Sequence, residues 1–164
     1  MTTPTKPEPL PAGTPAPDFT LSFKPKQPPV KLADYRGKKP VVLLFFPVAF
    51  SAVCTDEMCT VAESYSQWEA LDAEVLGISV DSPYANSQFA EVCGASFPIL
   101  SDFNREVIRA YGVLNPDFHG LKDVAYRSAF VIDRDGKVVY SWMSEDSAVM
   151  PPFEEIHAAV EAAA

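Results

Sequence analysis

The order of apolar and polar positions along the chain predicts buried strands that alternate with amphipathic helices. Residues 41–46 are all apolar and rich in β-branched and aromatic side chains, which is typical of a strand buried on both faces of a sheet. Pro47 ends this strand, and the next segment shows helical spacing with acidic residues near its start. The same patterns predict strands at 19–23, 41–46, 75–80, 129–133 and 137–142, and helices at 54–71, 83–93, 105–111 and 153–163.

This alternation indicates an α/β fold with a mixed central sheet and helices on both of its faces. The residues from Asp133 to Gly136 have the composition of a tight turn, so the last two strands are expected to form a hairpin. Gly94 is expected to end the helix at 83–93, because glycine readily adopts the left-handed conformation at a helix C-terminus.

Composition and charge narrow the class of protein. The 164 residues, 48% of them hydrophobic, suffice for one domain with its own core, which we place at 13–164 behind a flexible proline-rich leader at 1–12. The net charge of −9 argues against nucleic acid or an anionic membrane as a main partner. Without a signal-like or membrane-spanning stretch, and with three cysteines, the sequence favours a cytoplasmic protein.

Cys54 is the first residue whose position suggests chemistry. It is expected at the start of the helix that comes after the strand at 41–46. There, unpaired backbone N–H groups and the helix dipole favour a thiolate over a thiol. A buried structural cysteine is the alternative that this position alone leaves open.

The spacing of Pro47, Ser51 and Cys54 resembles the active-site motif of the peroxiredoxins, in which a proline is followed by threonine or serine and then by the peroxidatic cysteine. The resemblance extends to further segments in the family's order, which are GTPAPDFTLSF, LADYRGKKPVVLLFFP, VLGISVDSP, FPILSD with AYGV, and YRSAFVIDRDGKVVYSW. FPVAFSAVC and YSWMSEDSAVMPPFEEI are most similar to the alkyl hydroperoxide reductase E group, whereas the cysteine spacing resembles the bacterioferritin-comigratory or PrxQ group. The resemblance implies a thioredoxin-like fold.

The resemblance also implies roles for individual residues. Cys54 would attack a hydroperoxide as a thiolate and become a sulfenic acid. Arg127, expected at the start of a strand, would stabilise the thiolate and the charge that develops on the leaving oxygen. Ser51 would hydrogen-bond the peroxide and the sulfur, Pro47 would shape the loop and shield the sulfur from water, and Glu57 would orient the arginine.

Cys59 is the expected resolving residue, because a second thiol can attack the sulfenic acid and close a disulfide. Five residues along an ideal helix place the two Cα atoms roughly 8.7 Å apart, whereas disulfides need less than about 7 Å. If Cys54 and Cys59 share one helix, its first turn must therefore unwind during turnover. Cys93 and an external thiol are the alternative resolving agents.

The implied partners are a hydroperoxide substrate and a thioredoxin-like or low-molecular-weight thiol reductant, for a monomer or a homodimer. No cofactor or metal is indicated. His119 and His157 are far apart in the sequence, and we expect both to be ordinary surface residues. The sequence also contains no glycine-rich phosphate-binding loop. A thioredoxin-like disulfide exchanger and a non-enzymatic chaperone are less favoured. The exchanger usually separates its two cysteines by two residues, where this chain has four between Cys54 and Cys59.

Overall fold

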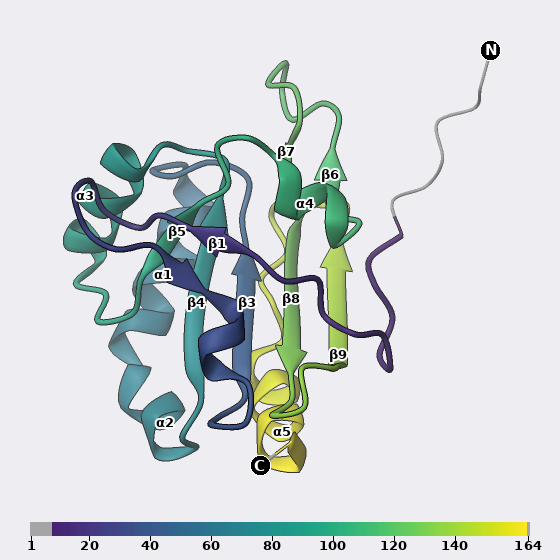
Figure 1. The fold of residues 1–164 in the computed structure, drawn as a ribbon. Coiled ribbons are helices and arrows are strands. Elements are labelled where there is room, and N and C mark those ends of the chain that lie inside the picture. The colour runs from purple at the N-terminus through teal and green to yellow at the C-terminus, as the bar shows by residue number, and fades with distance from the viewer. Residues whose placement is uncertain (1–7, 164) are drawn as a thin grey trace.

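The computed structural model describes residues 8–163 and has a five-stranded sheet in the order β5-β4-β3-β8-β9 at its centre (Figure 1). β3 lies in the middle, parallel to β4 and antiparallel to β8, and β4 is parallel to β5. This mixed α/β architecture confirms the predicted fold class. The strands of the sheet are β3 (Val41–Phe45), β4 (Glu74–Ser79), β5 (Ile99–Ser101), β8 (Arg127–Ile132) and β9 (Val138–Ser144).

The two faces of the sheet bury two separate apolar clusters, because neighbouring residues of a strand point to opposite sides. In β3, Val42 and Leu44 contribute to one cluster, while Val41, Leu43 and Phe45 contribute to the other. The cluster around Val42 and Leu44 packs against four helices, which are α1 (Ala52–Glu63), α2 (Tyr65–Ala70), α3 (Pro83–Cys93) and α5 (Phe153–Ala163).

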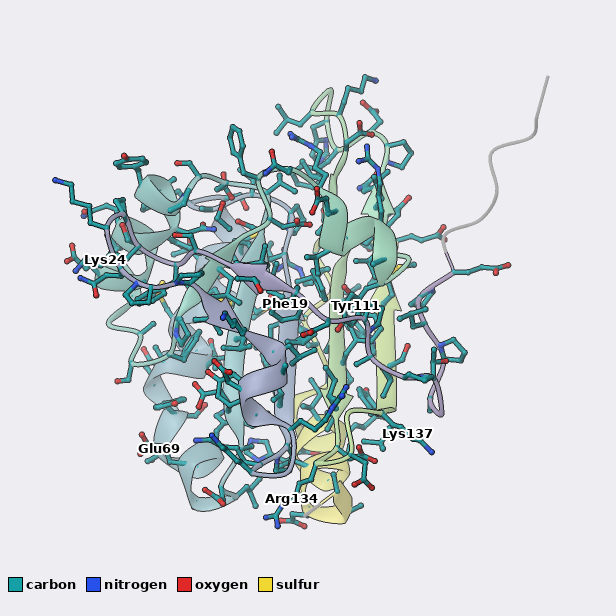
Figure 2. All side chains as sticks on the ribbon, in the orientation of Figure 1. Phe19, Lys24, Glu69, Tyr111, Arg134 and Lys137 are labelled. Carbon is teal, nitrogen blue, oxygen red and sulfur yellow. The ribbon has the colours of Figure 1, made fainter. Side chains whose placement is uncertain are left out.

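Shorter elements cover the other face of the sheet, which is the front in Figure 1. Phe19 and Tyr111 lie over this face with their ring centroids 6.4 Å apart, and both are labelled in Figure 2. The backbone N–H of Leu10 donates to the carbonyl of Tyr111 at 3.2 Å, so the chain is attached here from its tenth residue. The covering elements are η1 (Leu32–Tyr35), α4 (Glu106–Ala110) and the short pairs β1 (Thr20–Leu21) with β2 (Val30–Lys31) and β6 (Leu114–Asn115) with β7 (Val124–Ala125).

Two expected elements differ from the structure, and one strand of the central sheet was not expected. The strand predicted at 19–23 is only β1, which pairs with β2 outside the central sheet. The helix predicted at 54–71 is divided at Ser64, whose hydroxyl donates to the carbonyl of Thr60 at 3.1 Å and so competes with the helical backbone. β5 is absent from the prediction because its residues are too few for a periodic pattern.

Other local predictions are confirmed. α3 ends at Gly94, which has φ = 67°. The turn between β8 and β9 is closed by a 3.1 Å hydrogen bond from the Gly136 N–H to the Asp133 carbonyl.

The division into a leader at 1–12 and a domain at 13–164 stays a prediction, and residues 1–7 of that leader lie outside the described residues. Within residues 8–163, no helix is both long and apolar enough to cross a membrane.

α1 approaches the sheet closely because β4 carries a glycine beneath it. A Cβ atom added to Gly77 would lie 3.3 Å from the Met58 sulfur and 3.4 Å from a side-chain carbon of Ile99. A larger residue at this position would push against α1 from below. The close packing of α1 on the sheet, and therefore the position of Cys54, depends on the absence of a side chain at Gly77.

Candidate active site

The central pair of antiparallel strands brings the candidate residues to one edge of the sheet. Phe45, at the end of β3, pairs with Ser128, so Arg127 begins β8 where β3 gives way to the loop before α1. Pro47 is buried in that loop, and Cys54 lies in the first turn of α1. Arg127 and Cys54, more than seventy positions apart in the chain, therefore meet. No local sequence pattern shows this contact, although the resemblance to the peroxiredoxins implied it.

Cys54 is fully buried and has a cationic partner. It is the third residue of α1, where the backbone N–H groups of the first turn have no acceptor within the helix. Arg127 Nη2 donates to Cys54 Sγ at 3.3 Å. The helix N-terminus and the guanidinium both favour negative charge on the sulfur.

Arg127 is held from three sides and is only 1% exposed. Its Nε donates to the Ser147 carbonyl at 3.1 Å, its Nη1 pairs with Glu57 Oε1, and its Nη2 reaches the Cys54 sulfur. Burial opposes the charge, but Glu57 and Cys54 raise the pKa of Arg127 above its ordinary value. The guanidinium is therefore a fixed positive charge aimed at the sulfur.

Glu57 lies one turn after Cys54 on α1 and is fully buried. Burial raises the pKa of Glu57 to about 7, although the charge and hydrogen bond of Arg127 act in the opposite direction. Its second oxygen, Oε2, has no hydrogen-bond partner among the described residues. Glu57 thus contacts Arg127, and the orienting role expected for Glu57 stays a prediction.

Ser51 occupies the N-cap position of α1. Its hydroxyl donates to the Val48 carbonyl at 2.9 Å, and its own carbonyl accepts from the Thr55 hydroxyl at 2.8 Å. Within residues 8–163 this is the one hydrogen bond that the Ser51 hydroxyl makes, so it closes the loop rather than bonding the sulfur. A hydrogen bond to the sulfur or to a peroxide would need a rotation about χ1 and stays a prediction.

A pocket of about 390 Å³ opens beside the site and is lined by Pro47 and Arg127. His119, which lies in the loop between β6 and β7, also lines this pocket, although no local sequence pattern indicates it. The other lining residues are Asn115, Asp117, Phe118, Tyr126, Ser144, Glu145, Asp146 and Ser147.

The second histidine, His157, lies elsewhere. It differs from the expected ordinary surface residue, because its ring stacks on the buried Trp68 with the ring centroids 3.8 Å apart.

The other two cysteines lie away from Arg127, and all three are free thiols. Cys59 is on the uninterrupted helix α1, five residues after Cys54. The Cys93 thiol donates to the Thr55 carbonyl at 3.9 Å, on the helix that carries Cys59. Burial, followed by the contact with Cys59, raises the pKa of Cys93 to about 12.

Comparison with known proteins identifies a family to which this chain is similar. The family model described as AhpC/TSA family matches residues 12–141. The chain is 38% identical over 142 residues to alkyl hydroperoxide reductase E of Mycobacterium tuberculosis, covering 85% of this chain and 90% of that one.

Two solved structures of peroxiredoxins are similar along nearly their whole length. The crystal structure of peroxidoxin BcpB from Mycobacterium tuberculosis has a TM-score of 0.81 at 31% identity, covering 92% of this chain and 96% of that one. Peroxiredoxin Q from Xanthomonas campestris has a TM-score of 0.78 at 25% identity, covering 92% and 97%. The chain therefore belongs to the AhpC/TSA family, is a peroxiredoxin with a thioredoxin-like fold, and is an enzyme of that class.

Proposed function

We propose that this thiol-dependent peroxidase reduces hydrogen peroxide and organic hydroperoxides through a sulfenic acid on Cys54. The Cys54 thiolate attacks the terminal oxygen, the O–O bond breaks, and water or an alcohol leaves after taking up a proton. The observation that carries the proposal is the 3.3 Å hydrogen bond from Arg127 to the Cys54 sulfur in a buried site.

The same guanidinium would stabilise the developing charge on the leaving oxygen. Arg127 is pre-positioned by Glu57 and by the Ser147 carbonyl, so it needs no reorganisation as the bond breaks. The pocket lined by Pro47 and Arg127 would admit a peroxide next to this guanidinium. Pro47, which lacks a backbone donor, would keep its part of the pocket wall free of competing hydrogen bonds.

Cys59 would resolve the sulfenic acid by closing a Cys54–Cys59 disulfide within one chain. The continuous helix between the two residues keeps their Cα atoms too far apart for that bond, so the first turns of α1 must unwind. Breaking the Arg127 hydrogen bond when the sulfur is oxidised would remove one of the contacts that hold this end of α1. The reductant would be a thioredoxin-like or low-molecular-weight thiol.

Stopped-flow tryptophan fluorescence during peroxide addition tests this function, because Trp68 packs in the cluster that contains Cys54. Wild type should show a fast oxidation phase that Cys54→Ser loses and Cys59→Ser keeps. Mass mapping of oxidised Cys93→Ser should find the Cys54–Cys59 linkage. A Cys54→Ser variant that consumes peroxide as fast as wild type would contradict the proposal, and a linkage between two chains would contradict the resolving step.

A one-cysteine peroxidase resolved by an external thiol is the second candidate, and one observation favours it. Cys54 and Cys59 stand on an intact helix, so an external thiol that reached Cys54 before α1 opened would win the competition. Adding a low-molecular-weight thiol to Cys59→Ser should then restore turnover to the wild-type rate. The number of subunits and the cytoplasmic location stay predictions.

A further inference from the structure

Cys59 and Cys93 form a second thiol pair, on the side of α1 away from Arg127. Cys93 is the last residue of α3, and Cys59 lies in the second half of α1. Both side chains are partly exposed, whereas Cys54 is fully buried. Both residues are therefore partly open to solvent.

The contacts of Cys93 place its sulfur against the turn of α1 that ends at Cys59. Its thiol lies 3.9 Å from the carbonyl of Thr55, the residue four positions before Cys59, and residues four apart share one face of a helix. The Cys59 side chain is also near enough to raise the pKa of the Cys93 thiol. The two thiols are thus neighbours in the folded, reduced protein.

A disulfide between Cys59 and Cys93 would leave α1 intact, whereas the Cys54–Cys59 disulfide requires α1 to unwind. Cys59 and Cys93 belong to separate helices, so linking them breaks no helical hydrogen bonds within α1. The Cys54–Cys59 disulfide, by contrast, holds the first turns of α1 open and keeps Cys54 away from Arg127. Exchange from the Cys54–Cys59 disulfide to a Cys59–Cys93 disulfide would let α1 reform.

We propose that the oxidation is passed on from Cys54 to the Cys59–Cys93 pair, so that the disulfide awaiting reduction joins α1 to α3 and Cys54 is set free. This relay rests on the proposed peroxidase function and extends it by naming Cys93 as a third redox residue.

The steps of the relay balance in atoms and electrons. The Cys59 thiolate attacks the sulfur of the Cys54 sulfenic acid, an S–S bond forms, the S–O bond breaks, and the hydroxide takes up a proton as water. The Cys93 thiol then loses its proton to solvent and attacks Cys59 Sγ, and Cys54 leaves as a thiolate. An external dithiol finally reduces the Cys59–Cys93 disulfide by two electrons.

The environment of Cys93 fits an attack that comes only in the second step. In the reduced protein its pKa is raised to about 12 by burial and by the adjoining Cys59, which keeps it protonated. Once Cys59 is part of a disulfide, it no longer carries the thiol proton or charge through which it raises the pKa of Cys93. The first step thus removes two of the three causes that hold Cys93 inactive.

The departing sulfur gives the exchange its direction. Cys54 returns as a thiolate to the hydrogen bond from Arg127 Nη2 and to the free N–H groups of α1, both of which stabilise it. This stabilisation acts on the product, once α1 has reformed and Cys54 lies beside Arg127 again, so it favours the completed exchange. The reformed helix then adds its own hydrogen bonds to the product side.

Peroxide stoichiometry without added reductant tests the relay. Wild type should consume two equivalents of hydrogen peroxide per chain in its fast phase, because Cys54 is freed once and oxidised again. Cys93→Ser and Cys93→Ala should consume one, because their Cys54 stays in the first disulfide. Val92→Ser is the matched control, since Val92 precedes Cys93 on α3 with 58% of its surface exposed, and it should consume two.

Mass mapping identifies the linkages during the same reaction. A protease that cleaves after glutamate separates Cys54 from Cys59 at Glu57 and separates Cys59 from Cys93 at Glu63. Wild type quenched with acid should show Cys54–Cys59 early and Cys59–Cys93 later. In Cys54→Ser, a thiol-specific oxidant such as diamide should form Cys59–Cys93 directly, which tests the pairing independently of peroxide.

The relay is overturned if wild type consumes one equivalent and retains Cys54–Cys59, or if the linkage found is Cys54–Cys93. Failure of the proposed function has a different signature, because wild type would then show no fast consumption of peroxide that depends on Cys54. A folded Cys54→Ser variant that diamide does not crosslink at Cys59–Cys93 would also contradict the relay, while it leaves the peroxidase proposal intact.

Discussion

Cys54 and Cys59 stand on the same helix and face opposite environments. Cys54 is buried against the guanidinium of Arg127, which is itself paired with Glu57. Cys59 is partly exposed and has the thiol of Cys93 as its neighbour. The helix has unpaired N–H groups only in its first turn, where Cys54 lies. The two cysteines therefore differ both in their position along the helix and in the side chain that contacts them from another element.

Under the proposed function, this difference distinguishes the attacking sulfur from the resolving sulfur. A fixed cation would stabilise charge on Cys54 before the peroxide arrives, whereas Cys59 would acquire an electrophilic partner only after Cys54 has been oxidised. Substitutions at the start of α1 should therefore affect the first oxidation, and substitutions in its second half should affect the resolving step.

The largest expected effect comes from exchanging the two cysteines for serine in turn. Cys54→Ser should lower the rate of the first oxidation on the order of 10³-fold or more, because the nucleophile is lost. Cys59→Ser should leave that rate unchanged within about twofold and should accumulate a sulfenic acid that dimedone traps. Stopped-flow fluorescence measures both rates, and a comparable loss in the two variants would remove the distinction between attacking and resolving cysteine.

The next effect is that of the guanidinium. Arg127→Lys keeps a positive charge but cannot contact Cys54, Glu57 and the Ser147 carbonyl at once, so the first oxidation should slow about 10² to 10³-fold. Arg109→Lys, an exposed substitution on α4, is the matched control and should leave the rate unchanged. Equal rates in wild type and Arg127→Lys would show that charge alone suffices.

Glu57 should make the stability of the site depend on pH. Its pKa in the folded protein, about 7, lies above the ordinary value of 4.5, so its stabilising contribution is complete below about pH 4.5 and is lost as the pH rises through 7. Between pH 5 and pH 8 the free energy of unfolding of wild type should fall by up to about 3 kcal/mol more than that of Glu57→Gln.

Urea unfolding at the two pH values measures this difference. Glu69→Gln, on the exposed surface of α2 (Figure 2), removes a carboxylate without changing the buried pair and should behave as wild type. Parallel pH profiles for wild type and Glu57→Gln would mean that Glu57 stays ionised throughout this range.

The smallest expected effect is at the N-cap. Ser51→Ala removes the hydrogen bond to the Val48 carbonyl and the candidate donor to the peroxide, and should slow the first oxidation about tenfold. Ser51→Thr keeps the hydroxyl and should stay within about threefold of wild type. Ser64→Ala, at the other end of α1, is the control, and a large loss in Ser51→Thr would show that the added methyl group blocks the site.

Much of the fold could be predicted because its elements are strongly patterned. β3 is apolar throughout, and α3 has Pro83 at its start and Gly94 after its end, so local chemistry fixes the bounds of both elements. The two-residue strands and β5 are too short for any period to show. Their positions come from pairing with distant segments.

In the candidate site too, some features follow from neighbouring residues and others depend on contacts between distant segments. The spacing of Pro47, Ser51 and Cys54 is local, so the motif is visible in the sequence. The ion pair of Glu57 with Arg127 joins residues that lie seventy positions apart, and His119 reaches the pocket from another loop. Such contacts depend on the antiparallel pairing of β3 with β8, which a pattern along one strand cannot specify.

The sequence by itself determined the α/β class, the position of Cys54 in the first turn of a helix, and the five-residue spacing to Cys59. These properties depend on neighbours along the chain, so local propensity is sufficient to fix them. Only the tertiary structure decided that Arg127 contacts Cys54 and that Cys93 lies against Cys59, because each contact joins separate elements packed across the sheet or between helices.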